Sequence, residues 1–200
     1  MFTASGTWFH VTRADLEDYA GDVLVRVPLE RMVTDAESVV RSPQVVTIWA
    51  FLALLVFTSP VQAALAAAVV FLAWSVVGPG FVTLPILRVY RALDLVPLQG
   101  LAYVAVLSVL ANQGNLAGLS AGLAGFVLLR WGVVGRLLDP VAAVFRKSLY
   151  RLPIADQALR AVIVRHALAT GARLAELDDM ERRMLDIAHR RSTPRRSEPE

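Results

Sequence analysis

The most specific chemical pattern in this chain is a run of glycines spaced four residues apart. Gly114, Gly118 and Gly122 recur at this interval, with Ala121 and Gly125 beside them. Glycines at this spacing share one face of a helix and form a groove that lets another helix backbone approach closely. The pattern therefore predicts a helix-packing surface. It serves either an interface between copies of the chain or the packing of this helix against its own neighbours.

The segment Gly118–Gly122 also matches Gly-x-Ser-x-Gly, the nucleophile motif of lipases. That motif needs a strand-turn-helix context and a histidine base, whereas this segment lies within a predicted helix. None of the three histidines, His10, His166 and His189, lies in the apolar part of the chain. His166 and His189 also lack a partner at metal-ligand spacing, so we expect surface histidines. The sequence predicts no enzyme activity, no metal site and no cofactor.

Ion or proton transport would normally leave ionisable side chains inside the apolar segments. Near the middle of these segments the polar side chains are only Thr47, Ser75, Ser108 and Ser120, and each can hydrogen-bond its own helix backbone. A relay of ionisable groups is therefore not expected. A pore formed by several copies remains an alternative, since glycine-lined helices can form one without charges.

The composition indicates the solvent that surrounds these residues. Hydrophobic residues make up 56% of the 200-residue chain, and the mean hydropathy is +0.55. Between Pro43 and Trp131 the only charged residues are Arg88, Arg91, Asp94 and Arg130. A helix that is apolar on every side must lie in a large protein core or in lipid. This chain has too little other material to enclose such helices, so lipid is expected.

We predict an all-α integral membrane protein with four short transmembrane helices arranged as two hairpins. Ser42-Pro43 and Ser59-Pro60 each resemble a helix start, with a serine cap before proline, and Gln62 completes a capping box at the second. Gly78-Pro79-Gly80 is expected to end the second helix and Pro97 to open the third. The expected helices cover about residues 43–58, 60–77, 97–111 and 115–131.

An interfacial amphipathic helix is expected between the hairpins, over about residues 82–96. Arg88, Arg91 and Asp94 form one polar stripe on it, and Tyr90 is expected at the level of the lipid headgroups. The alternative is a connecting helix packed on the N-terminal flank. Arg130 and Trp131 end the fourth helix with the charge and aromatic ring typical of a membrane interface.

Small helical flanks are expected on the cytoplasmic side, over residues 1–42 and 136–192, followed by a disordered tail over 193–200. In the first flank, a helix over Arg13–Ala20 precedes the strand-like Asp22–Val27. A capping box over Thr34–Glu37 then starts a helix that ends at Arg41. In the second flank, Asp139-Pro140 is expected to precede a helix over Val141–Arg151.

Two further helices are expected in the second flank. Pro153 restarts the chain as a helix that ends at Gly171, and a last helix covers Ala172–Arg191. Leu177, Met180, Met184 and Ile187 recur on the last helix at spacings of three and four. This row is a possible face for a partner helix. The alternative is docking onto the preceding helix through Leu159, Val162 and Ile163.

The charge distribution predicts which side each loop occupies. The turns near Ser59 and over Asn112–Asn115 carry no charge, while all basic residues lie in the two flanks, the central loop and at Arg130. Loops rich in Lys and Arg stay in the cytoplasm, so both termini are expected there. Among the twenty basic residues only Lys147 is lysine, which is typical of a GC-rich genome. We expect a plasma membrane location, which in a bacterium is the inner membrane. Alternatively, both hairpins dip into the bilayer from the cytoplasmic side without crossing.

These features favour a non-catalytic membrane protein that acts as a scaffold, accessory or assembly subunit of a larger complex. The alternatives are a small homo-oligomeric channel or transporter and a membrane-shaping hairpin protein. The expected partners are the lipid bilayer and either copies of the same chain or other subunits. We attribute the formal net charge of +3 to the orientation of the protein in the membrane and to contact with lipid headgroups. No nucleic acid is expected.

Overall fold

A computed structural model describes residues 12–24, 26–81, 83–149 and 154–171, together with the single positions Asp179 and Arg182. Every element in these ranges is helical, and no strand occurs within them. The helices are α1 (Arg13–Leu24), α2 (Leu29–Phe57), α3 (Pro60–Phe81), α4 (Leu84–Leu93), α5 (Val96–Asn112), α6 (Leu116–Arg130), α7 (Val133–Leu149) and α8 (Ile154–Ala169). The predicted helix over Ala172–Arg191, with Leu177, Met180, Met184 and Ile187, lies outside the described residues.

The chain divides into two compact units. The helical bundle comprises Ser38–Arg151, and the flank unit comprises Met1–Glu37 with Leu152–Glu200. Among the described residues, two helices, α2 and α3 over Pro60–Gly78, are long and apolar enough to cross a membrane. The pair α4 and α5, bent by 58° at its break, counts as a third candidate if it forms one span. The helix α6 is apolar but shorter.

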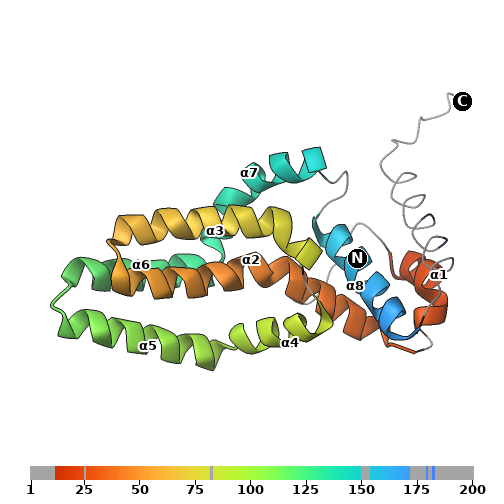
Figure 1. Ribbon diagram of the computed structural model, residues 1–200, viewed down its shortest axis with the longest axis horizontal. Helices are drawn as coiled ribbons and strands as arrows, with labels where there is room; N and C mark the ends of the chain where they lie inside the picture. Colours follow the sequence, from red (N-terminus) through yellow and green to blue (C-terminus); the bar gives the residue numbers. More distant parts are fainter. Residues whose placement is uncertain are drawn as a thin grey trace, which may run out of the picture. The chain divides into compact units, whose positions relative to one another are not determined.

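The core of the helical bundle forms around α2, which lies among α3, α5 and α6 (Figure 1). The helix α2 contributes the largest share, four large side chains, while α3 contributes two alanines. The buried cluster consists of Ile48, Phe51, Leu52, Leu55, Ala63, Ala67, Tyr103, Leu110 and Leu129. Tyr103 of α5 meets Phe126 of α6 edge to face, with ring centroids 4.4 Å apart.

The predicted helix start at Ser42-Pro43 is wrong, because α2 continues through it. Pro43 has no N–H for the carbonyl of Val39, which would otherwise lose its helical hydrogen bond. The Ser42 hydroxyl donates to that carbonyl instead, over 2.8 Å. The Trp74 indole N–H in turn donates to the Ser42 oxygen over 3.1 Å. Side-chain bonds thus replace the bond that proline removes, and the helix continues.

Two other predicted boundaries near the N-terminus are also wrong. Thr34 lies inside α2 and donates to the carbonyl of Glu30 over 2.7 Å, so it does not cap a new helix. The helix α1 continues to Leu24, which excludes a strand over the first residues of Asp22–Val27. In both places the helical pattern continues where a local polar signal predicted a break.

The start at Ser59-Pro60 is confirmed. The Gln62 carboxamide oxygen accepts from the Ser59 N–H over 3.2 Å, and the Gln62 N–H donates to the Ser59 hydroxyl over 3.4 Å. These two bonds form the reciprocal capping box. At its other end α3 runs past Gly78 to Phe81, one turn beyond the predicted stop.

The C-terminal boundaries are confirmed only in part. The helix α7 begins at Val133 and contains Pro140, so the predicted start after Asp139-Pro140 is wrong. A turn at Gly132, whose φ is +69°, separates α6 from α7 and sets the earlier start. The predicted stop of α8 is confirmed, because Gly171 adopts a φ of +83° directly after that helix.

In the flank unit, α1 packs against α8. Leu16 and Ala20 of α1 are buried, and α8 buries the row Leu159, Val162 and Ile163 that the sequence singled out as a packing face. Arg26 adds a polar contact, because its guanidinium donates to the carbonyl of Thr170.

Candidate functional site

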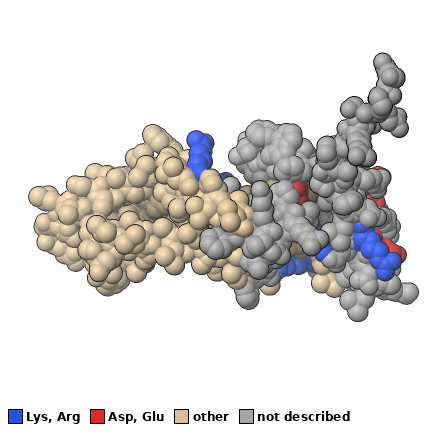
Figure 2. Space-filling view, turned by 90° about the horizontal axis from the view of Figure 1, so that it is seen from above, with Lys and Arg blue, Asp and Glu red and all other residues tan. Residues whose placement is uncertain are grey.

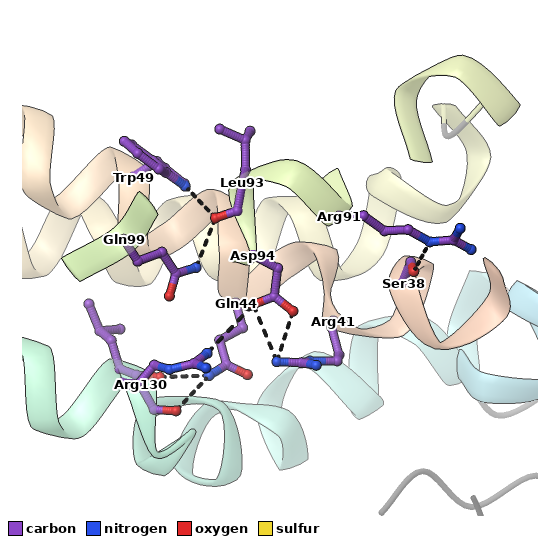
Figure 3. A network of polar contacts seen from close by, with 10 residues as sticks. Ser38, Arg41, Gln44, Trp49, Arg91, Leu93, Asp94, Gln99 and Arg130 are labelled. Atoms are coloured by element: carbon purple, nitrogen blue, oxygen red, sulfur yellow. Dashed lines mark hydrogen bonds and ion pairs between the residues drawn. The ribbon is translucent and has the colours of Figure 1, made fainter. Parts of the chain in front are cut away.

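A polar network lies at one end of the helical bundle, at the opposite end from the two short turns (Figures 1 and 3). The carboxylate of Asp94, just after α4, is its centre. An Arg41 Nη2 atom of α2 lies 2.9 Å from Asp94 Oδ2, and Arg130 Nη1, at the end of α6, lies 3.6 Å from Oδ1. The Asp94 side chain is 21% exposed, so these ion pairs join three helices at a partly covered position.

The break between α4 and α5 supplies a second part of this network. A helix end leaves its last carbonyl groups without intrahelical partners. The carbonyl of Leu93 accepts two side-chain donors, the Trp49 indole over 3.1 Å and the Gln99 carboxamide over 3.0 Å. Gln99 lies in the first turns of α5 and is buried. The bent pair is therefore fixed to α2 at its bend.

The end of α6 is held in the same way. The Gln44 carboxamide of α2 donates to the carbonyl of Leu129 over 2.7 Å and, more weakly, to that of Arg130 over 3.4 Å. On α4, the Arg91 Nε–H donates to the Ser38 hydroxyl over 3.2 Å. Side chains from one stretch of α2 thus bind the end of α4 and the end of α6, as Figure 3 shows.

The residues predicted to contact the membrane interface have different environments. Arg88 is exposed, whereas Arg91 and Arg130 belong to the polar network. Tyr90 is buried and meets Trp74 edge to face at 6.2 Å, so its ring packs within the protein. Trp131 is 71% exposed. The helix α4 therefore buries Leu87 and Tyr90, and the Tyr90 ring contacts Trp74 of α3.

The glycine series divides into three roles. Gly114 has a φ of +66° and belongs to the turn before α6, while the Gly118 N–H donates to the Asn115 side chain that caps α6 over 2.8 Å. A Cβ added to Gly122 would lie 2.8 Å from Leu107 of α5. At Gly125 it would overlap the ring of Phe51 of α2.

The groove at Gly122 and Gly125 is therefore filled by helices of the same chain. Leu55 of α2 also lies next to Gly122, at 3.4 Å from the position of an added Cβ. Ala121 is half-buried and packs against the core of the bundle. At these positions the small residues serve close packing of α6 on α2 and α5.

Three of the four apolar-segment hydroxyls bond their own helix as expected. Thr47 donates to the carbonyl of Pro43 over 2.7 Å, Ser108 to that of Val104 over 2.8 Å, and Ser120 to that of Leu116 over 2.9 Å. Ser120 lies within α6, so the Gly-x-Ser-x-Gly match is helical, as predicted.

The flank unit contains a polar pair that sequence reasoning missed. His166 was expected on the surface, but it is buried, and its Nε2 atom lies 2.8 Å from Asp35 Oδ2. The partners are 131 positions apart, so no local motif joins them. The helical period would have placed His166 correctly, because it continues the buried row of Leu159, Val162 and Ile163 at intervals of three and four.

Comparisons with protein families, with curated proteins and with solved structures found no match. What the site can do therefore follows from its own side chains. Among the described residues, no group of three or more histidine, aspartate or glutamate side chains could hold a metal ion. The network binds helix ends to one another through carbonyl groups and ion pairs. This arrangement suits a structural anchor.

Proposed function

We propose that the chain is a non-catalytic integral membrane protein in which α2, α3, α5 and α6 form two transmembrane hairpins. The apolar side chains that face outward support this proposal. Large ones are exposed along three of these helices, at Val61, Leu65, Val69, Val77, Leu98, Leu101, Val104, Val109, Leu116, Leu123, Val127 and Leu128. A surface so rich in exposed apolar side chains needs a covering, and lipid covers it on all sides at once.

The distribution of charge supports the orientation. One end of the bundle shows neither blue nor red side chains in the space-filling view (Figure 2), and at this end Figure 1 places the turns between α2 and α3 and between α5 and α6. Arg41, Asp94 and Arg130 lie at the opposite end. Because basic residues stay in the cytoplasm, the polar network would lie on the cytoplasmic side and both turns outside. In a bacterium the corresponding location would be the inner membrane.

The short helices can cross if the bilayer adapts. The helix α6 has 15 residues and therefore spans roughly 22 Å, against about 30 Å for an average hydrocarbon core. Local thinning of the bilayer compensates such a mismatch at modest cost. Hairpins that enter from the cytoplasmic side without crossing are the rival arrangement.

Single-cysteine labelling separates the two arrangements, because the chain has no cysteine of its own. Gln62 closes the cap of α3, so the neighbouring exposed Val61 is the better site on the first turn, with Gln113 on the second. We expect Val61→Cys and Gln113→Cys to react with an impermeant maleimide in intact cells. The control Arg88→Cys should react only after permeabilisation. Protection of both turns until the cells are opened would contradict crossing.

Within the membrane, we propose that the protein acts as a scaffold or assembly subunit. The network that binds the helix ends supports this role, because its polar groups are used for internal anchoring. A glycine-lined pore between copies is less well supported, since Phe51, Leu55 and Leu107 would have to leave the glycine groove.

Purification in mild detergent followed by native mass spectrometry tests the role. Partners that co-purify at a fixed ratio would support a subunit. A symmetric ring of this chain alone would favour a channel instead. Tubulation of vesicles by the purified protein would favour a membrane-shaping hairpin. Either of the last two results would overturn the scaffold proposal.

A further inference from the structure

The helix α7 carries an apolar row that no part of the described bundle covers. Leu137, Val141 and Val144 recur at intervals of four and three, which places them on one face of the helix. Their exposed fractions are 71%, 45% and 69%. An isolated exposed valine would need no explanation, but an aligned row on one helix indicates a surface that contacts something.

The packing of α7 on the bundle uses a different face. Ala142 is fully buried, and a Cβ added to Gly135 would lie 3.6 Å from the ring of Phe71 of α3. These two small residues, seven positions apart, let α7 lie close against α3 and α6. The row of Leu137, Val141 and Val144 is therefore additional to the residues that hold α7 in place.

The residues around this row identify its partner. Trp131, exposed at the turn before α7, is the aromatic type enriched at membrane interfaces. Arg136 of α7 is exposed, and the sequence of this helix is basic, with Arg136, Arg146 and Lys147 against the single acid Asp139. This net positive charge complements anionic lipid headgroups, whereas the apolar row matches the acyl chains beneath them.

The position of α7 agrees with the same partner. It begins directly after the end of α6, where Arg130 marks the transition from apolar to charged residues. Val77, near the end of α3, extends the exposed apolar surface toward this level. From these observations we propose that α7 lies in the membrane interface, with Leu137, Val141 and Val144 inserted among lipids. This inference rests on the proposed membrane location.

Spin labels on single cysteines test the proposal in the full chain. Cysteine is placed at Leu137, Val141 or Val144, and the protein is reconstituted into vesicles of equal parts phosphatidylcholine and phosphatidylglycerol. Collisions with oxygen, which concentrates in lipid, are compared with collisions with a neutral nickel chelate, which stays in water. We expect oxygen to dominate at all three positions and nickel at the exposed control position Arg136.

A label at Leu65 of α3, which is 64% exposed, separates the two possible failures. Oxygen dominance at Leu65 together with nickel dominance at the row of α7 would overturn the interfacial helix alone. Nickel dominance at Leu65 would overturn the membrane location itself. Spin–spin broadening between labels at Val144, lost on dilution with unlabelled protein, would show a second copy on the row and would also overturn the lipid contact.

Discussion

The consecutive helices α2 and α3 are similarly apolar, yet they pack in opposite ways. On α2 the large side chains Phe51, Leu52 and Leu55 are buried at the centre of the bundle. On α3 the alanines Ala63 and Ala67 face the protein, while the larger Val61, Leu65 and Val69 face outward. Where lipid replaces water, packing rather than hydrophobicity selects the inner face, and small residues allow close approach. Side-chain size therefore distinguishes a central helix from a peripheral one where hydropathy does not.

The two helices also use the same dipeptide differently. Ser59-Pro60 starts α3, and Ser42-Pro43 lies inside α2. Gln62 stands three residues after Ser59, and Val45 stands three residues after Ser42. Only the glutamine side chain can accept a hydrogen bond from the serine N–H, so only Ser59 forms a capping box. The Ser42 hydroxyl instead bonds the carbonyl that Pro43 leaves free.

The sharpest test of the contrast uses one substitution in both helices. Leu52→Ala opens a cavity in the core, and such changes cost about 2–5 kcal/mol. We expect the free energy of unfolding to fall by an amount near the lower end of this range. Leu65→Ala should change it by less than about 0.5 kcal/mol. Unfolding titrations in mixed detergent micelles measure both. Equal losses would refute the central and peripheral assignments.

The contact of α2 with α6 gives the next largest effect. Gly125→Ala should cost about 1–3 kcal/mol, since the new methyl group would overlap the Phe51 ring. Gly100 is the control, because it lies inside α5 with nothing within 4 Å of an added Cβ. Gly100→Ala should stabilise by up to about 1 kcal/mol. The same titrations apply, and a harmless Gly125→Ala would show that α6 is not held tightly against α2.

The Ser42-Pro43 step is tested by a double-mutant cycle. Ser42→Ala should cost about 1–2 kcal/mol, because it leaves the Val39 carbonyl and the Trp74 indole without this partner. Pro43→Ala restores a backbone N–H for Val39, so it should reduce that cost by about 1 kcal/mol. Ser108→Ala, which removes a hydroxyl from an intact helix turn, is the matched control. Additive losses in the cycle would contradict the replacement of the proline bond.

The smallest effect is expected at the cap of α3. Ser59→Ala should cost about 1 kcal/mol, through the N–H of Gln62 that loses its acceptor. Ser59→Thr keeps the hydroxyl and should lose less. Thermal midpoints in detergent compare the two variants. If Ser59→Ala cost more stability than Ser42→Ala, the assignment of Ser59 as a helix cap and of Ser42 as a helix-interior residue would be contradicted.

The sequence predicted the elements whose signals are local and reciprocal. The capping box of Ser59 and Gln62, the turn over Asn112–Asn115 and the stop at Gly171 each depend on neighbouring residues. The predicted break at Pro43 failed because its replacement bond is supported by Trp74, 32 positions away. Proline alone indicates a missing donor; the substitute donor, Ser42, is its neighbour in sequence, whereas the contact of Ser42 with Trp74 is visible only in the tertiary structure.

The candidate site could be predicted less well for the same reason. Asp94, Arg91 and Arg130 were singled out as charged residues near a membrane surface, but their partners Arg41 and Ser38 come from a distant helix. Burial of Tyr90 against Trp74 likewise depends on two helices meeting. The glycine spacing predicted close packing, and Phe51 and Leu107 as its occupants became visible only in the structure.

The polar network also has a consequence for the order of biosynthesis. Arg41 and Asp94 can meet once the first part of the bundle has left the ribosome, whereas the bonds of Gln44 to Leu129 and of Asp94 to Arg130 must wait for α6. Domains assemble from the N-terminus as they are translated. If the proposed membrane topology holds, α2 would wait with the Gln44 amide not yet bonded to α6, and the arrival of α6 would close the network.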